Sequence, residues 1–388
     1  MPDGGPLSTG PETAPTTPSP RTETAGQRVR RIALRSAAAA GIFVASRVGV
    51  LLVLWALGYD TRRGIANVLM RWDATQYVAI ARAGYQHSVA GPHEGLLSFF
   101  PLLPLAIRGV VEATGLTYVQ AGLGVSFLAG LAAAIIVWWL LYDFAGETGA
   151  NRGTALVFLS PGAFVLSMIY TEGLLIAFVA GALLALRHRR WVLAGALAGV
   201  ATATDPLASA VIVACAVTAF VAIREGREWR ALAAPLLAPA GIGAFFVFLW
   251  VNTGTPFAWF MAQRAGDQRG RLGNAIFHEI ADMAHTGFKW PNTWIRVVGL
   301  VIAVVLLVFF VRYRPGVAIA SYVAGVIILT LLSPIIGFSP RALLRGFPLI
   351  AVVGARMSKR WFEAVAGLSA LAMAALAILV LGSYGYTP

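Results

Sequence analysis

Asp73 lies in a polar stretch, 58–97, in which its carboxylate could act as a general base. Tyr77 follows one helical turn later, so the two side chains would share one face of a helix. Apolar residues recur at helical spacing through this stretch up to Gly84, which predicts an amphipathic helix lying in a membrane interface. The alternative is an ordinary surface helix with a solvated aspartate, and the pattern alone leaves both interpretations open.

Glu172 is the second candidate for chemistry. It stands next to Tyr170 at the junction of two apolar runs, 153–170 and 171–187. Ionisable groups at membrane depth are costly and tend to be functional. A simple polar helix end would explain the glutamate equally well, so this alternative also stays open.

Arg341 and Arg345 are four residues apart and therefore lie on one helical face. They fall at the outer end of a predicted membrane helix, so the excess of basic residues in cytoplasmic loops does not explain them. The guanidinium fork matches phosphate oxygens, so the pair predicts a phosphate site. Snorkelling of two long side chains to the membrane interface is the alternative.

Other polar residues give weaker signals. Arg47 lies in the middle of the first apolar run, where it needs a partner or a polar cavity. Asp205 could be that partner, although a separate polar cavity for each residue is the favoured interpretation. His278 begins a stretch like a zinc-protease motif, but the next histidine, His285, is seven residues on instead of four. The sequence contains no Walker or dinucleotide motif, and we expect no cofactor; the chemistry requires no divalent metal, although one is not excluded.

The composition indicates that these polar residues belong to a membrane protein. The chain has 388 residues, of which 58% are hydrophobic and only 12% charged, with a mean hydropathy of +0.76. Those values exclude a soluble enzyme, a disordered protein and a disulfide scaffold, and they predict many membrane helices. The net charge of +13 would suggest nucleic acid for a soluble protein. Here the arginines occupy short loops between apolar runs, so they indicate the cytoplasmic side, and no nucleic-acid partner is expected.

We therefore expect two regions. Residues 1–35 are predicted to be a disordered basic cytoplasmic tail, and 36–388 a transmembrane catalytic domain with outer loops at 58–97 and 252–293. The apolar runs predict nine full crossings, at about 36–57, 119–141, 153–170, 171–187, 231–251, 294–312, 316–334, 342–355 and 362–381.

Two further segments are predicted not to cross. Residues 191–223 lie between two basic loops, and Asp205-Pro206 interrupts them, so we expect two short half-helices that enter and leave on the same side. Residues 98–115 contain prolines and charges and predict a partial or re-entrant helix. The carboxyl terminus would then lie outside.

Several blocks of the sequence form a recognisable set. The most specific are Arg71-Trp72-Asp73-Ala74 with Tyr77 and Gly84-Tyr85, and Phe99-Phe100-Pro101-Leu102-Leu103-Pro104. Weaker blocks are Ser46-Arg47, Ser160-Pro161 with Tyr170-Thr171-Glu172, and Ser339-Pro340-Arg341 with Phe347-Pro348. From about residue 42 to residue 355 the sequence resembles the mannosyltransferase family of phosphatidylinositol-glycan class V, which includes bacterial members.

This resemblance implies an all-α, polytopic membrane glycosyltransferase of the GT-C type, with a polyprenyl-phosphate sugar donor. It places the catalytic base at Asp73 and implies an inverting transfer of mannose at the outer face of the plasma membrane. The partners would be polyprenyl-phosphate mannose, a glycolipid or other cell-envelope acceptor, and membrane lipids. We expect substrate to be bound by Arg71, Tyr77, Tyr170 and Glu172, and the donor phosphate by Arg341 and Arg345.

Asp205 departs from the family pattern, because many relatives carry an arginine in this segment. The reversed charge argues against a donor-phosphate contact at this position. It also supports one alternative, a noncatalytic membrane scaffold that keeps the fold. A secondary transporter or flippase is the other alternative, although such proteins place broken helices at the membrane midplane and show internal repeats.

Overall fold

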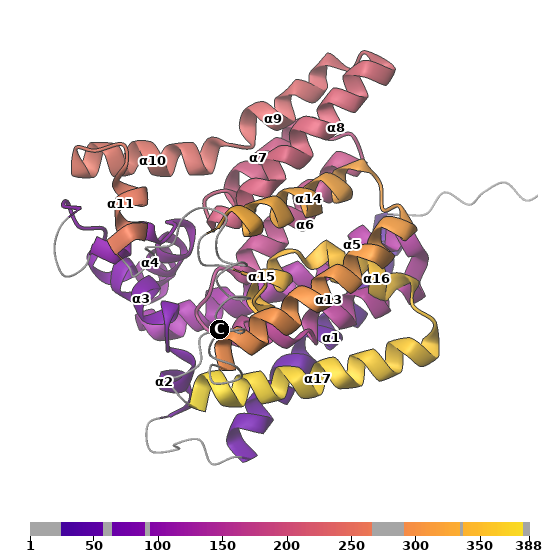
Figure 1. The fold of residues 1–388 in the computed structure, drawn as a ribbon, viewed down its shortest axis with the longest axis horizontal. Helices are drawn as coiled ribbons and strands as arrows, with labels where there is room; N and C mark the ends of the chain where they lie inside the picture. The colour runs from indigo at the N-terminus through magenta and orange to yellow at the C-terminus, as the bar shows by residue number, and fades with distance from the viewer. Residues whose placement is uncertain (1–24, 57–63, 90–93, 266–290, 334–336, 383–388) are drawn as a thin grey trace, which may run out of the picture.

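The computed structural model describes residues 25–56, 64–89, 94–265, 291–333 and 337–382, and every regular element in these ranges is helical (Figure 1). The amino-terminal half contains α1 (Ala25–Ala56), α2 (Ile65–Leu69), α3 (Asp73–Ala83), η1 (Glu94–Ser98), α4 (Leu102–Thr114), α5 (Tyr118–Phe158), η2 (Pro161–Ser167) and α6 (Glu172–Arg187). The rest contains α7 (Trp191–Ala201), η3 (Pro206–Ser209), α8 (Ala210–Gly226), η4 (Trp229–Leu232), α9 (Ala233–Leu237), α10 (Ala240–Thr253), α11 (Ala258–Ala265), α13 (Pro291–Tyr313), α14 (Val317–Leu332), α15 (Pro340–Arg345), α16 (Phe347–Arg356) and α17 (Lys359–Gly382).

The helices fit a membrane protein, with fewer long spans than the nine predicted. Among the described residues, six helices are long and apolar enough to cross a membrane, or seven if η2 and α6, bent by 108°, form one broken span. Two predicted crossings are too short, because α14 has 16 residues and α16 has 10. At 1.5 Å per residue these measure about 24 and 15 Å, against a hydrocarbon core of about 30 Å.

The amino-terminal region also differs from the prediction. The helix α1 begins at Ala25, so part of the expected tail 1–35 is helical, whereas residues 1–24 lie outside the described residues. The predicted partial helix at 98–115 is found as α4, which has 13 residues and is too short to span a bilayer.

The long element α5 is two helices folded back on each other. Gly146 has φ +69° and ψ −173°, which breaks the helical path, and the indole of Trp138 donates a 2.7 Å hydrogen bond to Asn151 Oδ1. In a straight helix these two residues would be about 20 Å apart. The predicted break between the runs 119–141 and 153–170 is therefore present, but the run 153–170 is not one crossing, because the helix ends at Phe158 and η2 follows.

The predicted turn within 191–223 is present, but the prediction that neither half crosses is wrong for the second half, because Pro206–Gly226, with 21 residues, is long and apolar enough to span. The helix α7 ends at Ala201, the chain turns through η3 at Pro206, and α8 returns from Ala210. Asp205 begins the turn, and its Oδ1 accepts a 2.9 Å hydrogen bond from the Leu207 backbone N–H. The break follows from the chemistry of the pair, since aspartate caps helix starts and proline removes an N–H donor.

The basic loops meet at one end of the bundle. Arg187 donates to the Asp143 carbonyl at 2.7 Å, beside the turn of α5, and Arg189 pairs with Glu228 after α8. Arg356 reaches the Phe144 carbonyl at 3.5 Å. Because α6 runs from Glu172 to Arg187, Glu172 lies at the opposite end of that helix from this basic cluster.

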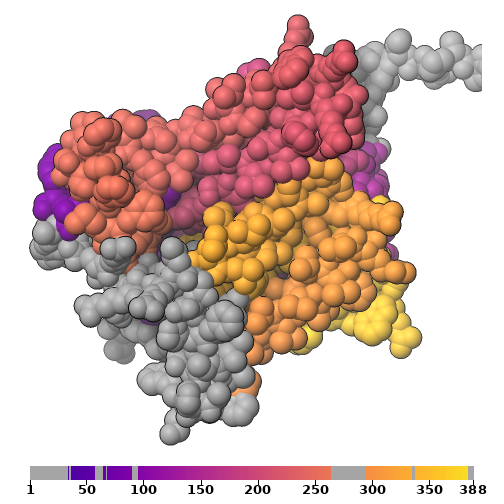
Figure 2. Space-filling view, turned by 45° about the horizontal axis from the view of Figure 1, so that its top comes forward, coloured from indigo at the N-terminus to yellow at the C-terminus, as the bar shows by residue number. Residues whose placement is uncertain are grey.

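Apolar side chains cover much of the outer surface, as expected for helices that face lipid. On α13, Val301, Val308 and Val311 are more than half exposed. Figure 2 shows one such face, where the orange helices α13 and α14 adjoin the pink to salmon segment of α8 to α10. A smaller apolar cluster of Phe100, Phe245 and Leu249 joins α10 and α11 to the segment before α4.

Arg47 is satisfied by backbone groups. Its guanidinium donates to the Phe158 carbonyl at 3.0 Å and to the Ala163 carbonyl, and the residue is only 3% exposed. Its partners in the described part of the chain do not include Asp205, which pairs with Arg345. Arg47 instead fixes α1 against the end of α5 and the start of η2, where carbonyls outside regular helix need donors.

Candidate functional site

Four predicted site residues form one ion-pair network. Arg341 Nη1 lies 2.5 Å from Asp73 Oδ2, and Arg341 Nε donates to Glu172 Oε1. Arg345 approaches the same Glu172 oxygen, with Nη2 at 3.0 Å and Nε at 3.2 Å. Three segments that are distant in the sequence therefore meet at one point.

Asp205 is a fifth member, which sequence reasoning did not place here. Its Oδ2 lies 2.8 Å from Arg345 Nη2, while its Oδ1 holds the turn before α8. The signal that could have found it is the predicted hairpin, whose tip must lie at the same end of the bundle as Glu172. The reversed charge at this position has a physical explanation, because Asp205 neutralises Arg345.

The network becomes more open toward Asp73. The Glu172 side chain is fully buried, and those of Arg345 and Asp205 are 8% and 7% exposed. The Arg341 side chain is 12% exposed and that of Asp73 is 33% exposed. A ligand arriving from outside would therefore meet Asp73 and Arg341 first.

A strained backbone positions Asp73 at the start of α3. Trp72, just before it, has φ +56° and ψ −129°, a conformation that costs a non-glycine residue of order 1–3 kcal/mol. The Trp72 indole donates to the Val380 carbonyl at 3.3 Å, and Arg71 donates to the Leu381 carbonyl. The carboxyl end of α17 thus fixes the residues that aim Asp73.

The helix α15 is placed by tight packing against η2. Ser339 caps α15 by accepting a 3.2 Å hydrogen bond from the Ala342 N–H, and Pro340 is its first residue. A Cβ atom on Gly162 would collide with the carbonyl oxygen of Pro340. The glycine after Ser160-Pro161 therefore allows the backbone approach that places Arg341.

Two tyrosines support the network. The Arg341 guanidinium carbon lies 4.4 Å from the centre of the Tyr170 ring, and the Asp73 N–H donates to the Tyr170 hydroxyl oxygen at 3.3 Å. Tyr77 is buried on α3, and its ring meets Phe99 edge to face at 5.1 Å. Burial and the negative charge of Asp73 raise the pKa of the Tyr77 hydroxyl above its ordinary value.

Arg71 does not join the network as described, because its guanidinium is directed to α17. Tyr170 and Glu172 are too buried to meet a ligand without movement, and they hold Arg341 instead. In the described part of the chain, no three His, Cys, Asp or Glu side chains gather closely enough to hold a metal ion. His278 and His285 lie outside the described residues.

The charges of this site nearly cancel. Three carboxylates and two guanidiniums leave one net negative charge. Such pairs must be well satisfied, because removing one partner leaves an uncompensated charge in a low dielectric. One atom departs from this pattern: Glu172 Oε2 is buried without a hydrogen-bond partner among the described residues.

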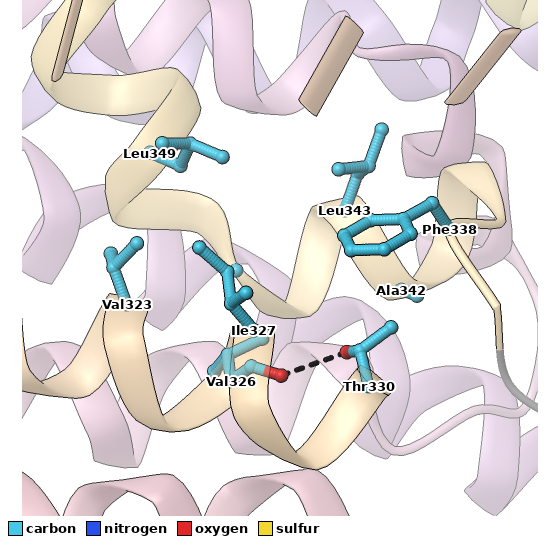
Figure 3. A pocket seen from close by; sticks show the side chains of 9 residues that line it. Val323, Val326, Ile327, Thr330, Phe338, Ala342, Leu343 and Leu349 are labelled. Carbon is cyan, nitrogen blue, oxygen red and sulfur yellow. Dashed lines mark hydrogen bonds between the residues drawn. The ribbon is translucent and has the colours of Figure 1, made fainter. Parts of the chain in front are cut away.

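Behind α15 lies a small apolar cavity of about 20 Å³ (Figure 3). Phe338, Ala342 and Leu349 face Val323 and Val326 of α14 across it. Its single lining hydroxyl, on Thr330, already donates to the Val326 carbonyl at 2.8 Å. A water molecule needs two or more polar partners, so this cavity is dry and far too small for a substrate.

Comparisons with known proteins place the chain in a family. A family model described as mannosyltransferase (PIG-V) matches residues 59–257. ArnT from Cupriavidus metallidurans bound to undecaprenyl phosphate is similar with a TM-score of 0.48 and 14% identity, over 74% of this chain and 56% of that chain. The same enzyme in the apo state gives a TM-score of 0.42 and 15% identity, over 74% and 55%.

The chain thus spans little more than half the length of those two structures. None of the curated proteins compared with the chain matches it. The matched region covers just over half of the 388 residues and includes Asp73, Glu172 and Asp205, three members of the ion-pair network. This chain is therefore a member of the PIG-V mannosyltransferase family.

Proposed function

We propose that this protein is an inverting membrane mannosyltransferase that uses polyprenyl-phosphate mannose. The single observation that carries the proposal is the contact between Asp73 and Arg341, which joins a partly exposed carboxylate to a guanidinium. A general base and a phosphate ligand must lie within one sugar ring of each other for such a transfer. Family membership supports mannose as the sugar.

The reaction needs a base for the acceptor hydroxyl and a positive group for the departing phosphate. Asp73 takes the proton from an acceptor hydroxyl as that oxygen attacks the anomeric carbon of the donor. The bond between this carbon and the phosphate oxygen breaks, and its electron pair leaves with the polyprenyl phosphate. Attack opposite the leaving group inverts the anomeric centre. Arg341 stabilises the negative charge that grows on the departing phosphate.

The donor phosphate would compete with Asp73 for Arg341. Without donor, the Arg341 guanidinium occupies the Asp73 carboxylate in an ion pair, so an acceptor hydroxyl does not have free access to that carboxylate. When Arg341 turns to a phosphate, Asp73 is released at the moment when a base is needed. Donor binding therefore prepares the base, and an acceptor that arrives first meets an occupied carboxylate.

The remaining residues form a supporting frame. Glu172 and Arg345 keep Arg341 and α15 in place, and Asp205 ties them to the tip of the hairpin. Tyr170 stacks under Arg341 and orients Asp73 through its N–H. Tyr77 packs against Phe99 one turn after Asp73 and helps to hold α3, and Arg71 acts as a positioning residue through α17.

We place this site at the outer face of the plasma membrane. The basic loops lie at the other end of α6 from Glu172, and basic loops stay in the cytoplasm. The amino terminus would then be cytoplasmic and the acceptor a glycolipid or another cell-envelope molecule. If both substrates are anchored in the same bilayer, they are already close together, and the enzyme mainly has to orient them for the transfer.

The test is transfer of radiolabelled mannose from the polyprenyl-phosphate donor by the purified protein in lipid nanodiscs. An extract of native membranes supplies the acceptor. We expect a new labelled product from the wild type and a loss of about a thousandfold in Asp73→Asn, which retains the size of the side chain. Glu112→Gln, a change at an exposed carboxylate on α4, should leave transfer unchanged.

Donor binding is measured separately by competition with unlabelled donor. Asp73→Asn should still bind it, because Arg341 keeps Glu172 as its partner. A fully active Asp73→Asn protein would refute Asp73 as the base. Transfer from guanosine-diphosphate mannose without lipid donor would refute the donor class, and a wild type that neither transfers mannose nor binds donor would favour a transporter.

A further inference from the structure

An open groove lies at the basic end of the bundle, away from the ion-pair network. It has a volume of about 420 Å³ and is lined by Arg190 and Arg230 with Trp191, Val192, Leu193 and Ala233. Arg190 precedes α7, and Arg230 lies in η4, so the groove runs between the hairpin and the helix that follows it. The site of mannose transfer lies at the other end of α7, near Asp205.

Two carboxylates at this end, Asp143 and Glu228, are paired with other basic residues. Asp143 contacts His188 at 2.7 Å and Arg187 at 3.9 Å. Glu228 pairs with Arg189 and accepts a 3.2 Å hydrogen bond from the Trp191 indole. Within the described part of the chain, the Arg190 and Arg230 side chains have no carboxylate partner. Two guanidiniums therefore line one groove, and neither has an ion-pair partner among the described residues.

The floor and rim of the same groove are apolar. Val192 is 65% exposed and Leu193 is 45% exposed, and Trp229, next to Arg230, is 67% exposed. A tryptophan in this position is typical of the membrane interface. The occupant must then carry a negative group for the arginines and a hydrocarbon part for the valine and leucine.

We propose that this groove binds an anionic phospholipid, with its phosphate between Arg190 and Arg230 and one acyl chain along Val192 and Leu193. Basic pockets between membrane helices commonly hold such headgroups. The bound phosphate offsets the repulsion between the two guanidiniums and so fastens η4 and α9 to the start of α7. The lipid is a structural ligand, and the proposal does not depend on the transfer activity.

The full-length protein is titrated in detergent with phosphatidylglycerol or phosphatidylcholine, and bound lipid is counted by native mass spectrometry. We expect the wild type to prefer phosphatidylglycerol. The double variant Arg190→Gln/Arg230→Gln should bind it at least tenfold more weakly. The control Arg224→Gln/Arg227→Gln removes the same charge from the end of α8 without changing a residue that lines the groove, and should change binding less than twofold.

A second variant tests the groove without changing charge. Ala233→Phe fills the space between the arginines and should also reduce phosphatidylglycerol binding, while the thermal unfolding temperature in phosphatidylcholine stays close to the wild-type value. Equal losses in the groove and control double variants would overturn the proposal in favour of general attraction. Displacement of the lipid by equimolar glycerol phosphate would overturn the role of the acyl chain.

Discussion

Arg345 is held between Glu172 and Asp205, with its Nη2 atom 3.0 Å from one carboxylate and 2.8 Å from the other. Its neighbour Arg341 shares Glu172 but reaches the more exposed Asp73. The two arginines look equivalent in the sequence, where they are four residues apart. The structure separates them into a buried arginine that is fully neutralised and one that faces the open part of the site.

This difference predicts that the two arginines fail in different ways. Arg341→Lys should reduce the rate of mannose transfer and weaken donor binding, because lysine cannot offer the same fork to phosphate. Arg345→Lys keeps the charge and should mainly lower stability, by less than about 3–5 kcal/mol, which is what removing one partner of a buried ion pair costs. Thermal unfolding and donor KM, measured on both variants, distinguish the two effects. Equal changes in both quantities for both variants would contradict the separation.

Asp205 is expected to tolerate the loss of its charge better than its reversal. Asp205→Asn keeps an oxygen for the Leu207 N–H and loses the charge that faces Arg345. Asp205→Arg places a third guanidinium beside two others and should yield a protein that is poorly folded and inactive. Expression level and unfolding temperature give the comparison. An Asp205→Arg protein as stable and active as the wild type would show that Arg345 does not need this partner.

Gly162 should not accept a side chain. A methyl group there would strike the Pro340 carbonyl and push α15, with Arg341, away from η2. Gly162→Ala is therefore expected to lower the transfer rate by tenfold or more, as small displacements at reacting groups are costly. Gly124→Ala on α5 is the control, since a Cβ there meets nothing within 4 Å. The result to look for is a loss confined to Gly162→Ala.

Trp72 offers a matched pair of variants. Trp72→Gly and Trp72→Ala both lose the indole bond to Val380, but only glycine adopts φ +56° without strain. We expect the glycine variant to be more stable than the alanine variant by about 1 kcal/mol. Chemical unfolding of both proteins in the same detergent measures this difference. The opposite order would mean that the backbone relaxes once the indole is removed.

Tyr77 is not expected to titrate in the working range. Because burial and the Asp73 charge raise its hydroxyl pKa, the phenol stays neutral beyond the pH at which a free tyrosine ionises, about 10. The pH profiles of transfer by the wild type and Tyr77→Phe should therefore have the same shape between about pH 6 and 10. An alkaline change in the wild type that disappears in Tyr77→Phe would contradict this.

Local chemistry predicted part of this molecule well. The helix that ends at Gly84 is present as α3, although it begins only at Asp73 because Trp72 interrupts the helical path. The hairpin at Asp205 followed from parity and proline chemistry. For the described residues, the count of nine crossings was wrong because apolar composition does not fix length: α14 and the part of α16 before Arg356 are apolar, but both helices are too short to span the bilayer.

For the candidate site, too, the sequence predicted the individual residues but not how they pair. Asp73, Glu172 and Arg341 could each be singled out, because an ionisable residue in an apolar chain is conspicuous. Which acid meets which base could not be deduced, since pairing depends on helix packing. Arg47 was considered with Asp205, yet Arg47 binds backbone carbonyls and Asp205 binds Arg345. Arg71 is close to Asp73 in the sequence, but its guanidinium donates to the Leu381 carbonyl of α17 and so helps to position Asp73 indirectly.

The surroundings of Arg47 also bear on how the protein is made. The carbonyl of Phe158 that accepts from Arg47 lies 111 residues further along the chain. During synthesis α1 therefore emerges long before the groups that satisfy its arginine exist. An unsatisfied guanidinium in hydrocarbon is costly, so α1 has reason to stay beside water or the insertion machinery until η2 is complete. We therefore expect α1 to reach its final place only after η2 has been synthesised.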